Sequence, residues 1–195
     1  FETTYYSLPI EEYINFISKA KIDYDNKSEL IDSLNENFSL MSSFKFKKDK
    51  GKVFFKTESG KELSLHLASS AIKTNFALWV YLAQMNKKAN LLMIDEPELN
   101  LHPDAQRLMA RLIVYLVNNG IKVAVSTHSD YFIKEINSLI MLKNSFEEKD
   151  DILQRYGYKG FDSLDADKVI AYHFKNGTAE KMLIEQNSGI QADTF

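Results

Sequence analysis

The spacing of apolar side chains changes several times along the chain, and each change indicates a new element. Apolar residues at every third or fourth position predict a helix over Pro9–Lys19 and a second helix over Lys27–Met41. The spacing then becomes two, because Phe44 and Phe46 alternate with lysines, and this predicts an antiparallel hairpin. A third strand is expected over Glu62–Leu67.

The middle of the chain has the pattern of a parallel α/β sheet. A helix is predicted over Ala71–Met85. The apolar run Leu91–Ile94 has no polar alternation, which is typical of a strand covered on both faces. A helix that begins at Pro103 and a short strand over Lys122–Ser126 then complete a right-handed βαβ unit.

The last third of the chain continues with helices and a hairpin. Ser129 or Asp130 can cap a further helix. The charged segment Glu147–Gly160 predicts a loop with a helical piece, and Asn176-Gly177 predicts a hairpin turn. The whole pattern therefore predicts an α/β fold, with a mainly parallel sheet, flanking helices and antiparallel hairpins.

Two adjacent carboxylates, Asp95 and Glu96, follow the first buried strand, and His128 follows the second. Neighbouring negative charges repel each other, so the pair indicates a metal ion and a water to be activated, with a helix-capping pair on a solvated rim as the alternative. Because ligands bind at the carboxyl ends of parallel strands, we expect the three groups to lie together. Phosphoryl transfer to water needs such a set: Asp95 for Mg²⁺, Glu96 to polarise the water and His128 to donate to the γ-phosphate.

The amino-acid sequence of these segments resembles that of a known family. LLMIDEPELNLHP, residues 91–103, looks like the Walker B strand and D-loop of ABC-type ATPases, and STHS, residues 126–129, looks like their switch-histidine segment. The resemblance is nearest to the AAA-family ATPases of the SMC, RecF-like and OLD-like group. It implies a P-loop-NTPase-like fold in which Asp95 serves the magnesium, Glu96 is the catalytic base and His128 senses the γ-phosphate.

The same resemblance implies contacts with a second head. Asn100 would lie in the D-loop, which crosses the dimer interface in this family. ASSAIK resembles the signature sequence, so Ser69, Ser70 and Lys73 are candidates to bind the nucleotide held by the partner head. Free N–H groups and the dipole at a helix start favour a phosphate there. Ala71 departs from the family, which has glycine at this position.

No phosphate-binding loop of the form G-x-x-x-x-G-K-[ST] is present in the chain. The two Gly-Lys pairs, at 51–52 and 60–61, lack both the preceding glycine and the following Ser or Thr. The resemblance implies a missing N-terminal P-loop half. We therefore expect residues 1–43 to be a helical remnant of the arm or lid region and residues 44–195 to be the C-terminal lobe of the head.

The function implied by the resemblance is ATP binding and hydrolysis with Mg²⁺, in a homodimer that sandwiches ATP. DNA or an effector nuclease would be further partners, in DNA-related or anti-phage defence work. One alternative is a catalytically silent interaction module, if Ala71 prevents turnover. The other is a DNA-contacting structural domain, whose support is the alternation of Phe44 and Phe46 with Lys45 and Lys47.

The composition of the chain restricts which partners, metal sites and cellular location we expect. The 195 residues carry a net charge of -3, so no global field attracts nucleic acid or a membrane, and any basic site must be local. The chain has no cysteine, which excludes disulfides and thiolate metal sites. No apolar run approaches membrane-spanning length, so we expect a cytoplasmic protein without a membrane partner.

Overall fold

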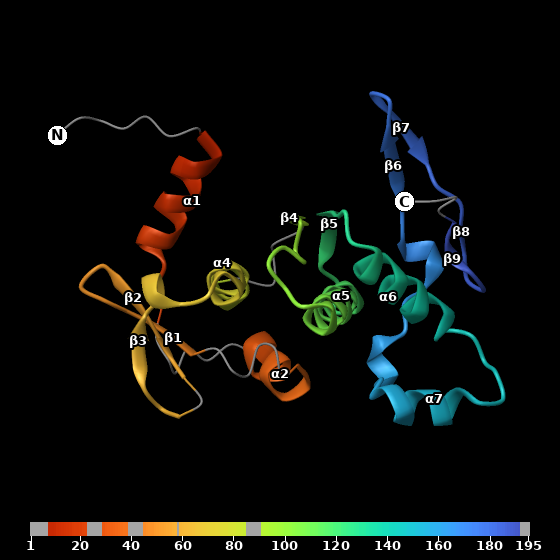
Figure 1. Cartoon of the computed structure of the whole chain (residues 1–195), viewed down its shortest axis with the longest axis horizontal. Helices are drawn as coiled ribbons and strands as arrows, with labels where there is room; N and C mark the ends of the chain where they lie inside the picture. The colour runs from red at the N-terminus through yellow and green to blue at the C-terminus, as the bar shows by residue number, and fades with distance from the viewer. Residues whose placement is uncertain (1–7, 23–28, 39–44, 58, 85–90, 192–195) are drawn as a thin grey trace. The chain divides into compact units, whose positions relative to one another are not determined.

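The computed structural model describes residues 8–22, 29–38, 45–57, 59–84 and 91–191 (Figure 1). The chain forms two compact units, Phe1–Lys88 and Ala89–Phe195. The division expected between residues 43 and 44 concerns the origin of the segments and stays a prediction. Among the described residues, no helix is long and apolar enough to cross a membrane.

The first unit contains helices and a three-stranded antiparallel sheet of order β1-β2-β3. Its elements are α1 Leu8–Lys19, α2 Glu29–Asn37, β1 Lys45–Asp49, β2 Lys52–Lys56, β3 Glu62–Ser64, the 3-10 helix η1 Leu65–Leu67 and α4 Ser70–Gln84. Phe46 of β1 is fully buried, and its ring lies 5.0 Å from Phe76 and 5.3 Å from Trp79 of α4, measured between centroids. The apolar side of the hairpin therefore packs into a core with α4.

This packing bears on the predictions for the N-terminal part. The first helix and the hairpin are confirmed, whereas the second helix ends at Asn37, and Met41 and Phe44 lie outside the described residues. The third strand is wrong at its end, because the chain turns into a 3-10 helix in which Ala68 N–H donates to Leu65 O at 3.0 Å. Phe46 is buried in the core, so its ring cannot stack on a base.

The second unit is built around two parallel strands, β4 and β5. Its helices and 3-10 helices are α5 Pro103–Asn118, α6 Asp130–Met141, α7 Lys149–Tyr156, η2 Gly160–Asp162 and η3 Ala166–Lys168. Its strands are β4 Leu91–Asp95, β5 Lys122–Ser126, β6 Tyr172–Lys175, β7 Thr178–Lys181, β8 Ile184–Glu185 and β9 Gly189–Ile190. α5 packs against α6 and β5, so the strand–helix–strand–helix order predicted from the sequence is confirmed.

Local chemistry explains where α5 begins and ends. Pro103 occupies the first turn, where its missing N–H costs no helical hydrogen bond. Leu112 and Leu116 are fully buried and anchor the helix to the core. At the other end, Gly120 has φ +86, and Ile121 N–H donates back to Leu116 O at 3.1 Å. A glycine tolerates this left-handed conformation, and the helix stops there as predicted.

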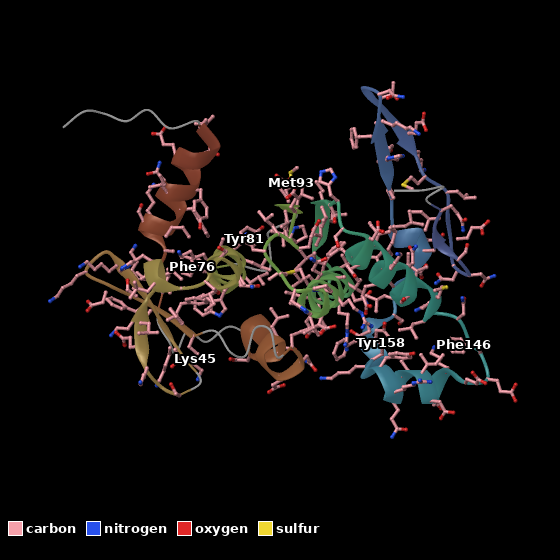
Figure 2. All side chains as sticks on the ribbon, in the orientation of Figure 1. Lys45, Phe76, Tyr81, Met93, Phe146 and Tyr158 are labelled. Atoms are coloured by element: carbon pink, nitrogen blue, oxygen red, sulfur yellow. The ribbon has the colours of Figure 1, made fainter. Side chains whose placement is uncertain are left out.

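One face of the β4–β5 pair is uncovered. Met93 is 75% exposed (Figure 2), Leu91 is also exposed, and they lie opposite Ala124 and Lys122 of β5. The prediction that both faces of Leu91–Ile94 are covered is therefore wrong for the second unit. α5 packs on one side of the pair, and the described part of this unit supplies no cover for the other.

The C-terminal hairpin follows the predicted turn. Asn176 and Gly177 both have positive φ, 52° and 78°, as a two-residue hairpin loop requires. A second pair, β8 with β9, was not predicted. Its docking depends on Asn137 of α6, whose side chain accepts from Ile190 N–H at 2.8 Å and donates to Ile190 O at 3.2 Å. A Cβ on Gly189 would come within 2.5 Å of Asn137, so this position requires glycine.

A charged cluster lies between α5, α6 and the segment after α7. Arg107 Nε donates to the buried Glu135 at 2.7 Å, and its Nη2 donates to the Tyr158 hydroxyl at 3.3 Å. Burial raises the pKa of Tyr158 above its ordinary value of 10.0, and the charge of Glu135 raises that pKa further. The folded protein therefore holds this proton more tightly than the unfolded chain does.

This raised pKa predicts a loss of stability at alkaline pH. The contribution of Tyr158 is fully present below about pH 10 and is lost as pH rises through the raised value. We expect Tyr158→Phe to weaken the fall in the free energy of unfolding between neutral pH and about pH 11. Urea unfolding at several pH values across this range measures the free energy of unfolding of each variant. Tyr172→Phe, at an exposed position, is the control, and equal slopes for both variants would contradict the prediction.

Candidate functional site

The two parallel strands end side by side, with Asp95 of β4 opposite Ser126 of β5. The Ser126 hydroxyl donates a hydrogen bond to Asp95 Oδ1. This bond orients a carboxylate that is otherwise exposed to solvent. Neither Asp95 nor Glu96 caps a helix, because the next helix begins only at Pro103. The strand end therefore presents an accessible and oriented carboxylate.

Glu96 turns the chain sharply at this point. Its φ is 45°, a left-handed conformation that is uncommon outside glycine and costs on the order of 1 kcal/mol or more. Its N–H donates to Ser126 O at 3.0 Å, and its carbonyl accepts from Leu99 N–H at 2.9 Å. These bonds hold the strained residue in place, and backbone strain of this kind is often found at functional sites.

The turn brings Glu96 close to His128. The distance from Glu96 Oε1 to His128 Nε2 is 3.7 Å. The His128 side chain is 88% exposed, so the pair adds little stability and leaves the imidazole accessible to a ligand. Asp95, Glu96 and His128 thus meet at one edge of the sheet, as the sequence predicted, while their chemical roles stay predictions.

Sequence reasoning missed a third carboxylate in this region. Glu98 is only 7% exposed, and its Oε1 accepts from the Thr127 hydroxyl at 2.6 Å and from His128 N–H at 3.0 Å. Its Oε2 has no hydrogen-bond partner among the described residues. The available signal was a third acidic residue in the DEPE run. Nothing local indicated that its side chain turns inward rather than toward water.

Gln106 in the first turns of α5 is a second missed residue. Its Nε2 donates to Leu101 O at 2.9 Å, and its Oε1 accepts from the Ser129 hydroxyl at 2.5 Å. The Ser129 hydroxyl in turn caps α6 by accepting from Phe132 N–H at 3.2 Å. The segments that follow β4 and β5 are therefore tied together through side chains as well as through the sheet.

The other predicted site residues belong to other segments of the chain. Asn100 is exposed between β4 and α5, with φ 62°. Ser69, Ser70 and Lys73 are exposed at the start of α4, in the first unit, and the Ser69 hydroxyl accepts from Ile72 N–H at 3.4 Å. The predicted helix start is confirmed there. The nucleotide-binding roles of these four residues stay predictions.

The oxygen donors at the strand ends suit magnesium. Mg²⁺ binds oxygen ligands and commonly uses one or two carboxylates together with substrate phosphates. Asp95 offers an exposed carboxylate with the Ser126 hydroxyl beside it. The described residues contain no cluster of three or more acidic, histidine or cysteine side chains that could hold a metal. An exposed carboxylate beside a hydroxyl is a donor set that fits Mg²⁺ bound together with phosphate oxygens.

Comparison with known proteins identifies the family. A family model described as an AAA ATPase domain matches residues 4–133, more than half of the chain. The chain belongs to the AAA ATPase domain family. The matched residues include the strand-end cluster of Asp95, Glu96 and His128. Membership confirms an ATPase-type domain and agrees with the α/β, P-loop-NTPase-like fold expected from the sequence.

The individual proteins that resemble this AAA ATPase domain share limited sequence identity with it. An OLD nuclease from Thermus scotoductus is 31% identical over 96 residues, which are 49% of this chain. The chain spans only 17% of that relative. A solved structure from work on ATP-driven dimerisation and DNA-stimulated activation of SMC ATPases aligns with a TM-score of 0.48 and 13% identity, covering 81% of this chain and 87% of the other.

Proposed function

We propose that this AAA ATPase-family chain binds and hydrolyses ATP with Mg²⁺, together with a P-loop segment outside these 195 residues. The observation that carries the proposal is the convergence of Asp95, Glu96 and His128 at the ends of two adjacent parallel strands. Within it, Glu96 Oε1 lies 3.7 Å from His128 Nε2. Family membership supports the reaction type, and the donor set supports the metal.

The proposed chemistry assigns each side chain one task. Asp95, oriented by Ser126, would hold magnesium, which would neutralise charge on the phosphate oxygens. The oxygen of a water attacks the γ-phosphorus, and a water proton passes to the Glu96 carboxylate. The bond between the γ-phosphorus and the bridging oxygen breaks, and its electron pair leaves on that oxygen as part of ADP. His128 Nε2 donates a hydrogen bond to the γ-phosphate.

Two observations support a P-loop in another segment. The sequence lacks the motif, and ATP hydrolysis by this family of sites requires a cradle for the phosphates. The exposed Leu91 and Met93 lie on a parallel strand, whereas parallel sheets are normally covered on both faces. A segment that bears the P-loop and packs on this face would satisfy both requirements.

The proposal extends to a homodimer that sandwiches ATP. Ser69, Ser70 and Lys73 lie at the start of α4, where the helix dipole and a lysine favour a phosphate held by the second copy. Asn100 would contact that copy from the exposed turn before α5. An effector nuclease as a further partner is supported by the likeness to an OLD nuclease. DNA as a partner and a role in anti-phage defence rest on the resemblance of the sequence motifs alone.

A substitution at Ala71 tests the signature role in the protein that contains both segments. Removing its methyl group lets a phosphate approach the start of α4 more closely, so Ala71→Gly should strengthen ATP-dependent dimerisation about tenfold, the value of roughly one hydrogen bond. Light scattering with and without ATP measures it. Ala77→Gly in the same helix is the control for the lower helix propensity of glycine. An equal response of both variants would remove the signature from the proposal.

A catalytically silent interaction module remains the alternative function, because Ala71 replaces the family glycine. Such a module would dimerise or dock a partner and would show no magnesium-dependent phosphate release. Measuring release and dimerisation in the same preparation separates the two functions.

A further inference from the structure

We propose that Glu98 is a positioning residue, which holds the Thr127–His128 peptide and thereby sets where His128 stands beside Glu96. The inference rests on the proposed ATP hydrolysis and adds a residue to it. Glu98 would touch neither nucleotide nor metal. It acts through the backbone of the segment that carries His128.

The contacts form a continuous chain across the two strand ends. Ser129 N–H donates to the Thr127 hydroxyl oxygen at 3.1 Å, and that hydroxyl donates to Glu98 Oε1 at 2.6 Å. The same Oε1 accepts from His128 N–H at 3.0 Å. Three consecutive residues after β5 are therefore held, directly or through Thr127, by one carboxylate oxygen.

Glu98 itself sits on a rigid support. Its carbonyl accepts from Leu101 N–H at 3.0 Å, and the turn before it closes through Leu99 N–H and Glu96 O at 2.9 Å. Pro97 is buried beside it and restricts the backbone further. The acceptor for His128 is thus fixed relative to Glu96, two residues earlier in the same turn.

The position of His128 depends on this hold more than on packing. Its side chain is 88% exposed, and among the described residues its Nε2 approaches Glu96 Oε1 at 3.7 Å. A ring with so little packing is located mainly by its own backbone. The backbone N–H of His128 donates to Glu98, so Glu98 holds the backbone from which the imidazole extends.

The burial of Glu98 argues against a purely structural role. Glu98 is 7% exposed, and burying a carboxylate costs free energy that its hydrogen bonds must offset. A glutamine would keep an accepting oxygen for the same two donors without burying a charge. The carboxylate instead accepts from the Thr127 hydroxyl at 2.6 Å and from His128 N–H at 3.0 Å, and both bonds are directed at the segment that bears the proposed γ-phosphate donor.

Hydrogen exchange tests the hold without any reference to ATP. Mass spectrometry of the peptide around residues 124–131, with fragmentation that resolves single amides, reports exchange at His128 N–H. Glu98→Ala should speed it about tenfold, whereas Glu98→Gln keeps an acceptor oxygen and should change it little. Thr127→Val removes the hydroxyl and Thr127→Ser retains it, so this matched pair provides the test if Glu98→Ala fails to fold. Unchanged exchange at His128 N–H in a folded Glu98→Ala variant would overturn the inference. If that variant does not fold, equal exchange in Thr127→Val and Thr127→Ser would overturn it.

Kinetics tests the consequence in the protein that includes the P-loop segment. Glu98→Ala should lower kcat about tenfold or more with little change in KM, because the residue affects His128 rather than nucleotide binding. In a His128→Ala background, Glu98→Ala should lower kcat no further, since its effect passes through His128. Equal losses of kcat in both backgrounds would overturn the positioning role.

The two proposals fail in different ways. A parent protein without magnesium-dependent hydrolysis overturns the proposed function, and the hold on His128 is then judged by exchange alone. An active parent in which exchange at His128 rises but kcat is unchanged in Glu98→Ala overturns the positioning inference and leaves the proposed function intact.

Discussion

Glu96→Gln is expected to lower ATP turnover by a factor of about 100 or more while ATP binding persists. The amide keeps the size and the hydrogen-bonding capacity of the side chain but cannot take the proton of the attacking water. Bound ATP should then accumulate, so ATP-dependent dimerisation should persist or increase. Phosphate release and light scattering measure the two effects in the protein that carries the P-loop segment.

A matched control comes from the C-terminal hairpin. Glu180 of β7 is exposed and lies in the same unit, so Glu180→Gln makes the same chemical change away from the strand ends. It should leave turnover within about twofold of the parent. Asp95→Asn, in contrast to this control, should lower turnover as strongly as Glu96→Gln, through loss of the proposed metal ligand.

The 195-residue chain alone is expected to show no turnover, because it lacks a P-loop. Magnesium-dependent hydrolysis by this chain, abolished by Glu96→Gln, would show that the phosphates are held in another way. Turnover that survives Glu96→Gln in the longer protein would remove Glu96 from the chemistry.

The second large effect concerns the stability of the unit that carries the site. Arg111 of α5 binds Asp162 with two parallel contacts, Nε to Oδ1 at 3.2 Å and Nη2 to Oδ2 at 2.7 Å. Asp162 is fully buried, and its Oδ2 also accepts from Lys159 N–H at 2.7 Å. Arg111 Nη2 further donates to Gly157 O at 2.8 Å. This pair fastens the segment after α7 to α5.

Asp162→Ala should therefore lower the free energy of unfolding of this unit by about 3–5 kcal/mol, because it leaves a largely buried guanidinium without its counter-charge. The melting temperature should fall by on the order of 10 °C. Arg111→Met combined with Asp162→Ala should cost less than the sum of the two single changes, since no unpaired charge remains.

Thermal and urea unfolding provide the measurement, with Asp167→Ala as the control at an exposed aspartate. The control should change the free energy of unfolding by no more than about 0.5 kcal/mol. An Asp162→Ala variant as stable as the control would show that the ion pair contributes nothing net. The predicted stability effect would then be wrong.

The candidate site could be predicted in outline because its parts follow simple local rules. Asp95, Glu96 and His128 each come directly after an apolar strand, and parallel strands end at the same edge of a sheet. The sequence also predicted both the start of α5 at Pro103 and its end near Gly120, since a proline and a glycine act on the backbone where they stand. These inferences need no knowledge of distant contacts.

Glu98 shows where local rules stop. In sequence it is one more acidic residue in a charged run, and only the fold turns its carboxylate inward to His128 N–H, 30 residues away. Its burial depends on how the ends of β4 and β5 pair, and the spacing of apolar residues along the chain does not predict that pairing.

By itself, the sequence determined the order of helices and strands, the edge at which the charged groups gather and the absence of a phosphate-binding loop. These depend on backbone preferences and on periodicity. Only the tertiary structure decided which distant residues meet. It brought Arg111 to Asp162, 51 residues later in the chain, left the Met93 face of the sheet exposed, and placed the Glu98 carboxylate against His128 N–H. Such features arise from contacts between segments far apart in the chain, and they follow from how the packed elements meet.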